Sequence, residues 1–201
     1  MFDCIIPIGQ TCNISLLLQN VNLKKCSTLF EWFVSPCLAD ITEILIKIGN
    51  NADNDILQCK GPNIYMGENI FSGHYTIDQF KQIYERRRNR LVDMIKTSKK
   101  ILFARFEAHP VNYSNQDLDN FKNSILTINN NVEEIKLLVI APFMELENPF
   151  LIKIVYDKHE SDPFCKSDEI NELFIDNLKK LEYNFSDLSN EKITDNIQFT
   201  D

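Results

Sequence analysis

One stretch near the start of the chain limits the folds that the sequence can adopt. Residues 5–8 form an apolar run that predicts a buried strand, and Gly9 ends it. Residues 10–11 fill a tight turn, and a helix is expected from Asn13 to Val21. A buried strand that leads directly into a helix is typical of α/β proteins.

Cys12 stands at the beginning of this expected helix. A thiol in that position meets the unpaired backbone N–H groups of the first turn. The positive end of the helix dipole lowers the pKa of a thiol and favours the reactive thiolate. A cysteine beside a strand can also be a small buried apolar group. The position makes Cys12 a candidate nucleophile, with a structural role as the alternative.

The remaining apolar patterns continue the same alternation of strands and helices. Helical spacing is expected over Ala39–Ile48, Asp78–Ser98, Ser114–Asn129 and Asp168–Leu181, and strands over Asn63–Met66, 99–107, Ile135–Pro142 and Phe150–Tyr156. Strand, helix and strand at these lengths predict a right-handed βαβ unit. We therefore expect one α/β domain over residues 1–185, with a mostly parallel central sheet flanked by helices, and a flexible polar tail over 186–201.

Composition excludes several classes of protein. No apolar run reaches the eighteen or so residues that a membrane span needs, and the first residues lack a signal peptide, so a cytoplasmic protein is expected. The six cysteines are expected to be thiols, without the spacing of a metal site, and no cofactor is expected. The net charge of −8 argues against general binding to nucleic acids.

Arginines are concentrated in one short run. Four of the five lie at Arg86, Arg87, Arg88 and Arg90, within a predicted helix. Arginine binds anions through a planar fork of donors, so the run is a candidate site for an anion or an acidic partner. A solvated helix face beside Glu85 is the alternative.

An aromatic stretch and a histidine supply further candidates. Residues 26–36 hold the only tryptophan, Trp32, beside the carboxylate of Glu31. A carboxylate among aromatic residues either caps a backbone turn or orients a catalytic partner, because an unpaired buried charge is too costly. His74 lies in a glycine-containing turn before the helix expected at Asp78, where it could act as a base.

Several of these motifs resemble a family described as papain-like cysteine peptidases, found in bacteria and in large DNA viruses. The shared pieces are Phe2-Asp3, Ile8-Gly9-Gln10-Thr11-Cys12, Leu29-Phe30-Glu31-Trp32, Phe71 to His74, Arg86 to Arg90, and Leu102 to Arg105. The resemblance covers residues 2–142. Leu29 replaces a proline of the family pattern and Glu31 replaces an aspartate.

The resemblance implies a cysteine hydrolase that acts on a peptide or protein substrate. Such chemistry needs a thiolate, a base, an orienter and donors for the oxyanion. The candidates are Cys12 as nucleophile, His74 as base, Glu31 or Asp78 as orienter, and Gln10 with the Cys12 backbone N–H as oxyanion donors. The candidates for binding substrate or an anion are Trp32, Arg86, Arg87, Arg90 and Arg105.

Other interpretations remain open at this point. His159, after Asp157, would suit a flavodoxin-like esterase or acyltransferase that uses Cys12, and His109 is a third candidate base. A non-enzymatic interaction protein, such as one encoded by a virus, would use the arginine-rich helix to bind an anion or a partner.

Overall fold

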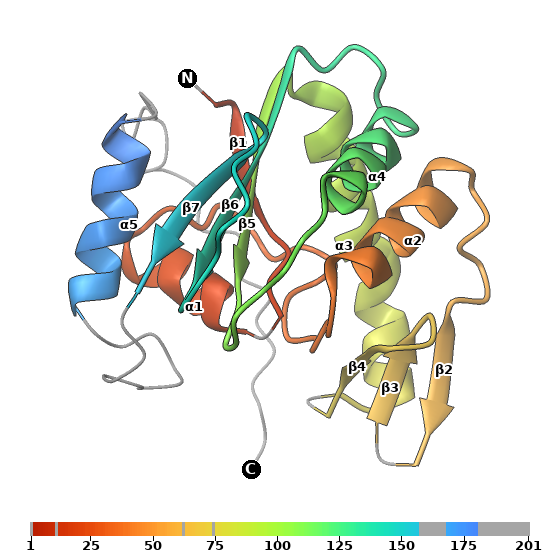
Figure 1. Ribbon diagram of the computed structural model, residues 1–201. Helices are drawn as coiled ribbons and strands as arrows, with labels where there is room; N and C mark the ends of the chain where they lie inside the picture. The colour runs from red at the N-terminus through yellow and green to blue at the C-terminus, as the bar shows by residue number, and fades with distance from the viewer. Residues whose placement is uncertain (1, 11, 62, 74, 157–167, 181–201) are drawn as a thin grey trace.

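The computed structural model places a four-stranded parallel sheet at the centre of the protein (Figure 1). The structure describes residues 2–10, 12–61, 63–73, 75–156 and 168–180. The strands of the sheet, in spatial order, are β1 (Cys4–Pro7), β5 (Lys100–Phe106), β6 (Glu134–Ala141) and β7 (Leu151–Val155). All three pairings are parallel. This confirms the prediction of a single α/β domain with a mostly parallel sheet.

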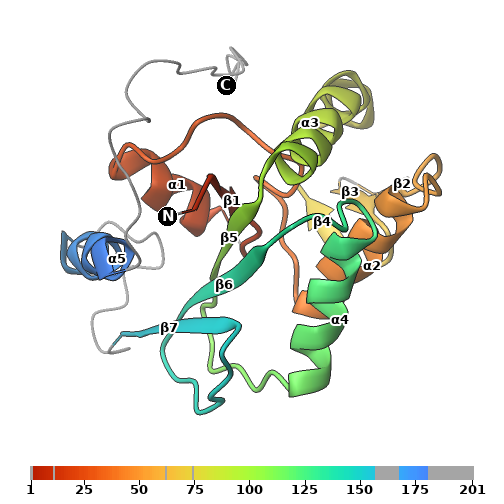
Figure 2. The same ribbon diagram turned by 90° about the horizontal axis from the view of Figure 1, so that it is seen from above.

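Helices cover both faces of this sheet (Figures 1 and 2). On one face lie α1 (Asn13–Asn20) and α5 (Asp168–Lys180), and on the other lie α2 (Leu38–Gly49), α3 (Ile77–Thr97) and α4 (Asn115–Leu126). Side chains alternate between the faces, so Phe103 packs with α2–α4 whereas its neighbour Leu102 packs with α1 and α5. Continuous apolar strands of this kind are buried on both sides.

Local signals start the longer helices where the sequence predicts them. Thr76 caps α3, because its hydroxyl accepts a hydrogen bond from the Gln79 N–H at 3.3 Å while the Gln79 side chain accepts from the Thr76 N–H at 2.9 Å. Ser114 and Asp117 form the same reciprocal pair at the beginning of α4. Each pair satisfies two backbone donors that the helix itself leaves unpaired.

A second, antiparallel sheet lies beside α2 and α3 (Figure 1). Its strands are β2 (Leu57–Lys60), β3 (Asn63–Met66) and β4 (Ile70–Ser72). The sequence predicted β3 but not its two partners, because β2 is mostly exposed and β4 is only three residues long. Gly67 occupies the turn between β3 and β4 with φ of +70°, a conformation that favours glycine.

The carboxyl ends of β1 and β5 bring several candidate residues to one edge of the parallel sheet. Backbone pairing continues beyond the strands, because the Ile8 N–H donates to the Ala104 carbonyl at 2.8 Å and the Gln10 N–H donates to the Phe106 carbonyl at 3.2 Å. Ligands of open α/β sheets bind at this edge. The edge therefore positions the candidate site.

Some expectations concern residues that the structure does not describe, among them the polar tail over 186–201. Within the described ranges, no helix has the length and apolar character needed to cross a bilayer.

Candidate functional site

Cys12 occupies the N-cap position of α1, five residues after β1 ends at Pro7. Its carbonyl accepts the first hydrogen bond of the helix, from Leu16 N–H at 3.1 Å, while its side chain makes no capping hydrogen bond. Partial burial raises the pKa of the Cys12 thiol, against the opposing effect of a hydrogen bond from its own backbone N–H. This direction corrects the lowered pKa expected from the helix dipole. Attack by Cys12 at neutral pH therefore needs a base.

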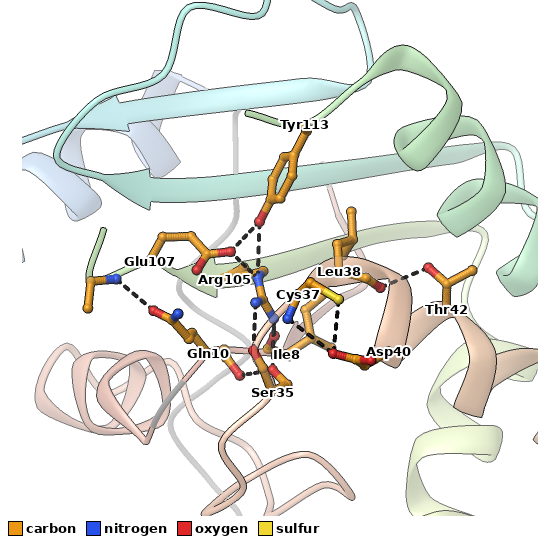
Figure 3. Close-up of polar contacts among 12 residues, drawn as sticks. Ile8, Gln10, Ser35, Cys37, Leu38, Asp40, Thr42, Arg105, Glu107 and Tyr113 are labelled. Atoms are coloured by element: carbon orange, nitrogen blue, oxygen red, sulfur yellow. Dashed lines mark hydrogen bonds and ion pairs between the residues drawn. The ribbon is translucent and has the colours of Figure 1, made fainter. Parts of the chain in front are cut away.

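Gln10 is held in one orientation two residues before Cys12 (Figure 3). Its side-chain oxygen accepts a hydrogen bond from the Ala108 N–H at 2.9 Å. Its backbone is fixed at both ends, since its N–H donates to Phe106 and its carbonyl accepts from the Ser35 N–H at 3.0 Å. The Ala108 contact uses the acceptor end of the Gln10 side chain, and the amide nitrogen, which is its donor end, could then donate to a ligand.

Glu31 is a buried carboxylate with two protein partners. One oxygen accepts from the Thr28 N–H at 2.7 Å, and the other pairs with the Lys24 ammonium at 2.5 Å. The Thr28 contact caps a backbone turn, which is one of the two roles expected from the sequence. Orientation of a histidine by Glu31 stays a prediction, and Asp78 lies exposed in the first turn of α3.

The segment before position 74 is joined to the Cys12 loop through the aromatic stretch. Val34 and Phe71 exchange backbone hydrogen bonds of 2.7 and 3.0 Å, and Ser35, the residue after Val34, donates to Gln10. His74 itself lies outside the described residues, as does His159. The contacts therefore connect the chain segments that carry the predicted nucleophile and base.

His109 follows β5 on the loop that Gln10 contacts. It is exposed, and its neighbour Ala108 is the residue that donates to the Gln10 side chain. The hydrogen bonding between β1 and β5 continues beyond the strands and places Gln10 opposite Glu107. Cys12 lies two residues after Gln10 in the sequence, and His109 lies two residues after Glu107. His109 therefore stays a candidate base.

Trp32 lies half-buried against the larger hydrophobic core. Its backbone has φ of +66°, in the left-handed region that residues other than glycine rarely adopt. Such conformations are concentrated at binding and active sites. The predicted contact between Trp32 and substrate stays a prediction.

The arginine run does not form one surface. Arg87 is 2% exposed, and it donates to the Tyr75 hydroxyl at 3.1 Å with its guanidinium over the Tyr75 ring. Arg90 is half-buried with a 3.4 Å contact to the Ser27 carbonyl, whereas Arg86 is exposed. The three arginines therefore differ in burial and in their contacts, and they do not form one shared anion site in this structure.

Arg105 lies inside the protein rather than at a surface. Its guanidinium donates to the Ile8 carbonyl, to the hydroxyl and carbonyl of Ser35, to Glu107 and to the Tyr113 hydroxyl (Figure 3). Because its side chain is 0% exposed, Arg105 holds chain segments together and does not reach a ligand in this conformation. Burial raises the pKa of Tyr113, and Glu107 raises it further.

Sequence reasoning missed three members of this network, Ser35, Glu107 and Tyr113. Ser35 lies 70 residues from Arg105 along the chain, so no local spacing reveals that contact, whereas Glu107 and Tyr113 lie two and eight residues after Arg105. The one available signal for Glu107 was its place two residues after Arg105, on the same face of the sheet.

A second polar cluster was also missed. Asp53 accepts two hydrogen bonds from Arg88, at 2.5 and 2.9 Å, and one from the Tyr84 hydroxyl at 2.9 Å. These residues line a hollow of about 810 Å³ between α3 and the loop after α2. None of the candidate catalytic residues that the structure describes lines this hollow. Across the described ranges, no three histidine, cysteine or acidic side chains converge as a metal site would require.

Comparison of the chain with models of protein families, with curated proteins and with solved structures found no match.

Proposed function

We propose that this protein is a cysteine hydrolase in which Cys12 attacks an acyl group, most simply that of a peptide or isopeptide bond. The observation that carries the proposal is the fixed orientation of Gln10, whose side-chain oxygen accepts a hydrogen bond from the Ala108 N–H two residues before Cys12, the residue at the N-cap position of α1. A nucleophile and an adjacent amide donor at the carboxyl edge of a parallel sheet suit acyl transfer.

The reaction follows from what each group can do. A base removes the Cys12 proton, and the sulfur forms a bond to the acyl carbon as the carbonyl oxygen takes up negative charge. The Gln10 amide and the Cys12 backbone N–H donate to that oxyanion. The leaving group departs with the proton from the base, and water then cleaves the thioester and restores the thiol.

The resemblance to papain-like cysteine peptidases favours His74 as the base of this reaction. The hydrogen bonds between Val34 and Phe71, and between Ser35 and Gln10, support it by joining the two chain segments. His109 is the competing base, supported by the Ala108 contact with Gln10. A base is part of the proposal because partial burial raises the pKa of the Cys12 thiol, which makes the thiolate a minor form at neutral pH.

Hydrolysis of p-nitrophenyl acetate tests the proposal. We expect the Cys12→Ala variant to lose turnover. The control is Cys37→Ala, which removes the exposed thiol of Cys37 and should retain turnover. Removal of the Gln10 amide in Gln10→Ala should lower turnover about 100-fold, as for other oxyanion donors. Turnover that survives in Cys12→Ala would refute the proposal.

The same assay distinguishes the two histidines. If His74 is the base, His74→Ala loses turnover and His109→Ala keeps it, and the reverse result assigns the base to His109. Turnover that persists in the double variant would exclude a Cys–His pair formed by either residue.

A further inference from the structure

We propose that Ser35 is a positioning residue of the thiol site and that Arg105 holds Ser35 in place. This inference rests on the proposed function, since it concerns how the loop before Cys12 is shaped. Ser35 is 1% exposed and Arg105 is fully buried, so neither side chain is placed to contact substrate.

Ser35 and Arg105 together donate hydrogen bonds to the three successive carbonyl groups of residues 8–10, the segment before Cys12 that we call the nucleophile loop (Figure 3). Arg105 donates to the Ile8 carbonyl at 2.9 Å, the Ser35 hydroxyl donates to the Gly9 carbonyl at 2.7 Å, and the Ser35 N–H donates to the Gln10 carbonyl at 3.0 Å. A loop whose consecutive carbonyls are all engaged has little freedom to rotate its peptide groups. The direction in which Gln10 leaves β1 is thereby set.

Arg105 fixes the other side of Ser35. Its guanidinium donates to the Ser35 hydroxyl at 2.9 Å and to the Ser35 carbonyl at 2.8 Å. The Ser35 hydroxyl has one proton, which it donates to the Gly9 carbonyl, and its oxygen accepts the hydrogen bond from Arg105. Glu107 and Tyr113 in turn hold the guanidinium from the far side. The order of contacts runs from Tyr113 through Arg105 and Ser35 to Gly9.

Ser35 also joins the nucleophile loop to a second segment. The preceding residue, Val34, pairs with Phe71 through two backbone hydrogen bonds. Displacement of Ser35 would therefore move the Gln10 loop relative to Phe71. A donor to an oxyanion must lie 2.7–3.1 Å from its target, so small displacements of Gln10 weaken catalysis.

A matched pair of serine variants tests this role. Ser35→Ala removes the hydroxyl and keeps the backbone N–H bond to Gln10. Ser124→Ala removes a hydroxyl of equal burial in α4, where it donates to the Phe121 carbonyl at 2.6 Å. Both variants are compared with wild type for kcat and KM toward p-nitrophenyl acetate and for thermal midpoint. Ser35→Thr, which restores a hydroxyl, is the rescue variant.

The expected result is a loss of kcat in Ser35→Ala by about tenfold or more with KM unchanged, because misplacement of about 1 Å can cost about 100-fold. Ser124→Ala should keep wild-type kcat at a similar thermal midpoint, and Ser35→Thr should recover kcat. Wild-type kcat in Ser35→Ala, or an equal loss in Ser124→Ala, overturns the positioning role while Cys12 remains the nucleophile. Turnover that survives in Cys12→Ala instead overturns the proposed function, and the positioning role with it.

Discussion

Replacement of Glu107 by glutamine measures how much the buried ion pair with Arg105 contributes to stability. The Arg105 Nε lies 2.5 Å from a Glu107 oxygen, and both side chains are at most 2% exposed. Glutamine keeps the shape but removes the charge, so the guanidinium is left buried without a counter-ion. Breaking a buried pair in this way costs about 3–5 kcal/mol. That is a large fraction of the roughly 5–15 kcal/mol by which domains are stable.

Urea unfolding followed by the fluorescence of Trp32, the only tryptophan, gives the measurement. With a slope of about 2 kcal/mol per molar urea, the midpoint of Glu107→Gln should fall by about 1.5–2.5 M. Glu133→Gln is the control, because Glu133 pairs with Lys99 at the surface and its loss should leave the midpoint unchanged. Equal midpoints for the two variants would refute the reasoning.

Three further predictions concern other parts of the fold. Burial alone would raise the pKa of Asp53, but hydrogen bonds from Arg88 and Tyr84 outweigh it and hold the pKa below its ordinary value. The stability that ionised Asp53 contributes is therefore lost as the pH falls below about 4. The gap in urea midpoint between wild type and Asp53→Asn should narrow there, and a constant gap would contradict the prediction. Burial raises the pKa of Cys4 to about 11, so the Cys4 thiol ionises at lower pH in the unfolded chain than in the folded protein. The free energy of unfolding should therefore fall as the pH rises from about 9 to about 11, and it should fall less in Cys4→Val. Ser114→Ala removes the cap of α4 and should cost about 1 kcal/mol in urea unfolding, whereas no loss would exclude the cap.

The fold could be predicted from the sequence to the extent that burial leaves a periodic pattern. β5 and β6 are buried along nearly their whole length, so their apolar runs identify them as central strands. β2 has an exposed run of polar residues and no alternation, and its pairing with β3 therefore left no signal. The same reason explains why the small sheet was expected to be a loop with one strand.

The site divides in the same way between local and distant contacts. The beginning of α1 next to Cys12 depends on neighbours in the chain, so the sequence predicts it well. The engagement of Gln10 by Ala108 and Ser35 depends on residues 98 and 25 positions away, which a single sequence does not reveal. The pKa of Cys12 was expected to be lowered, since the helix dipole can be read from the sequence whereas the partial burial that raises the pKa cannot.

The most direct test of the account locates the acyl group on the protein. After brief reaction with p-nitrophenyl acetate and quenching in acid, peptide mass mapping identifies the acetylated residue. We predict a thioester on Cys12 that forms faster than any modification of the exposed Cys37 and Cys59, and that is lost in Cys12→Ala. Acetylation of Cys37 and Cys59 with Cys12 unmodified would contradict the claim that Cys12 is the nucleophile.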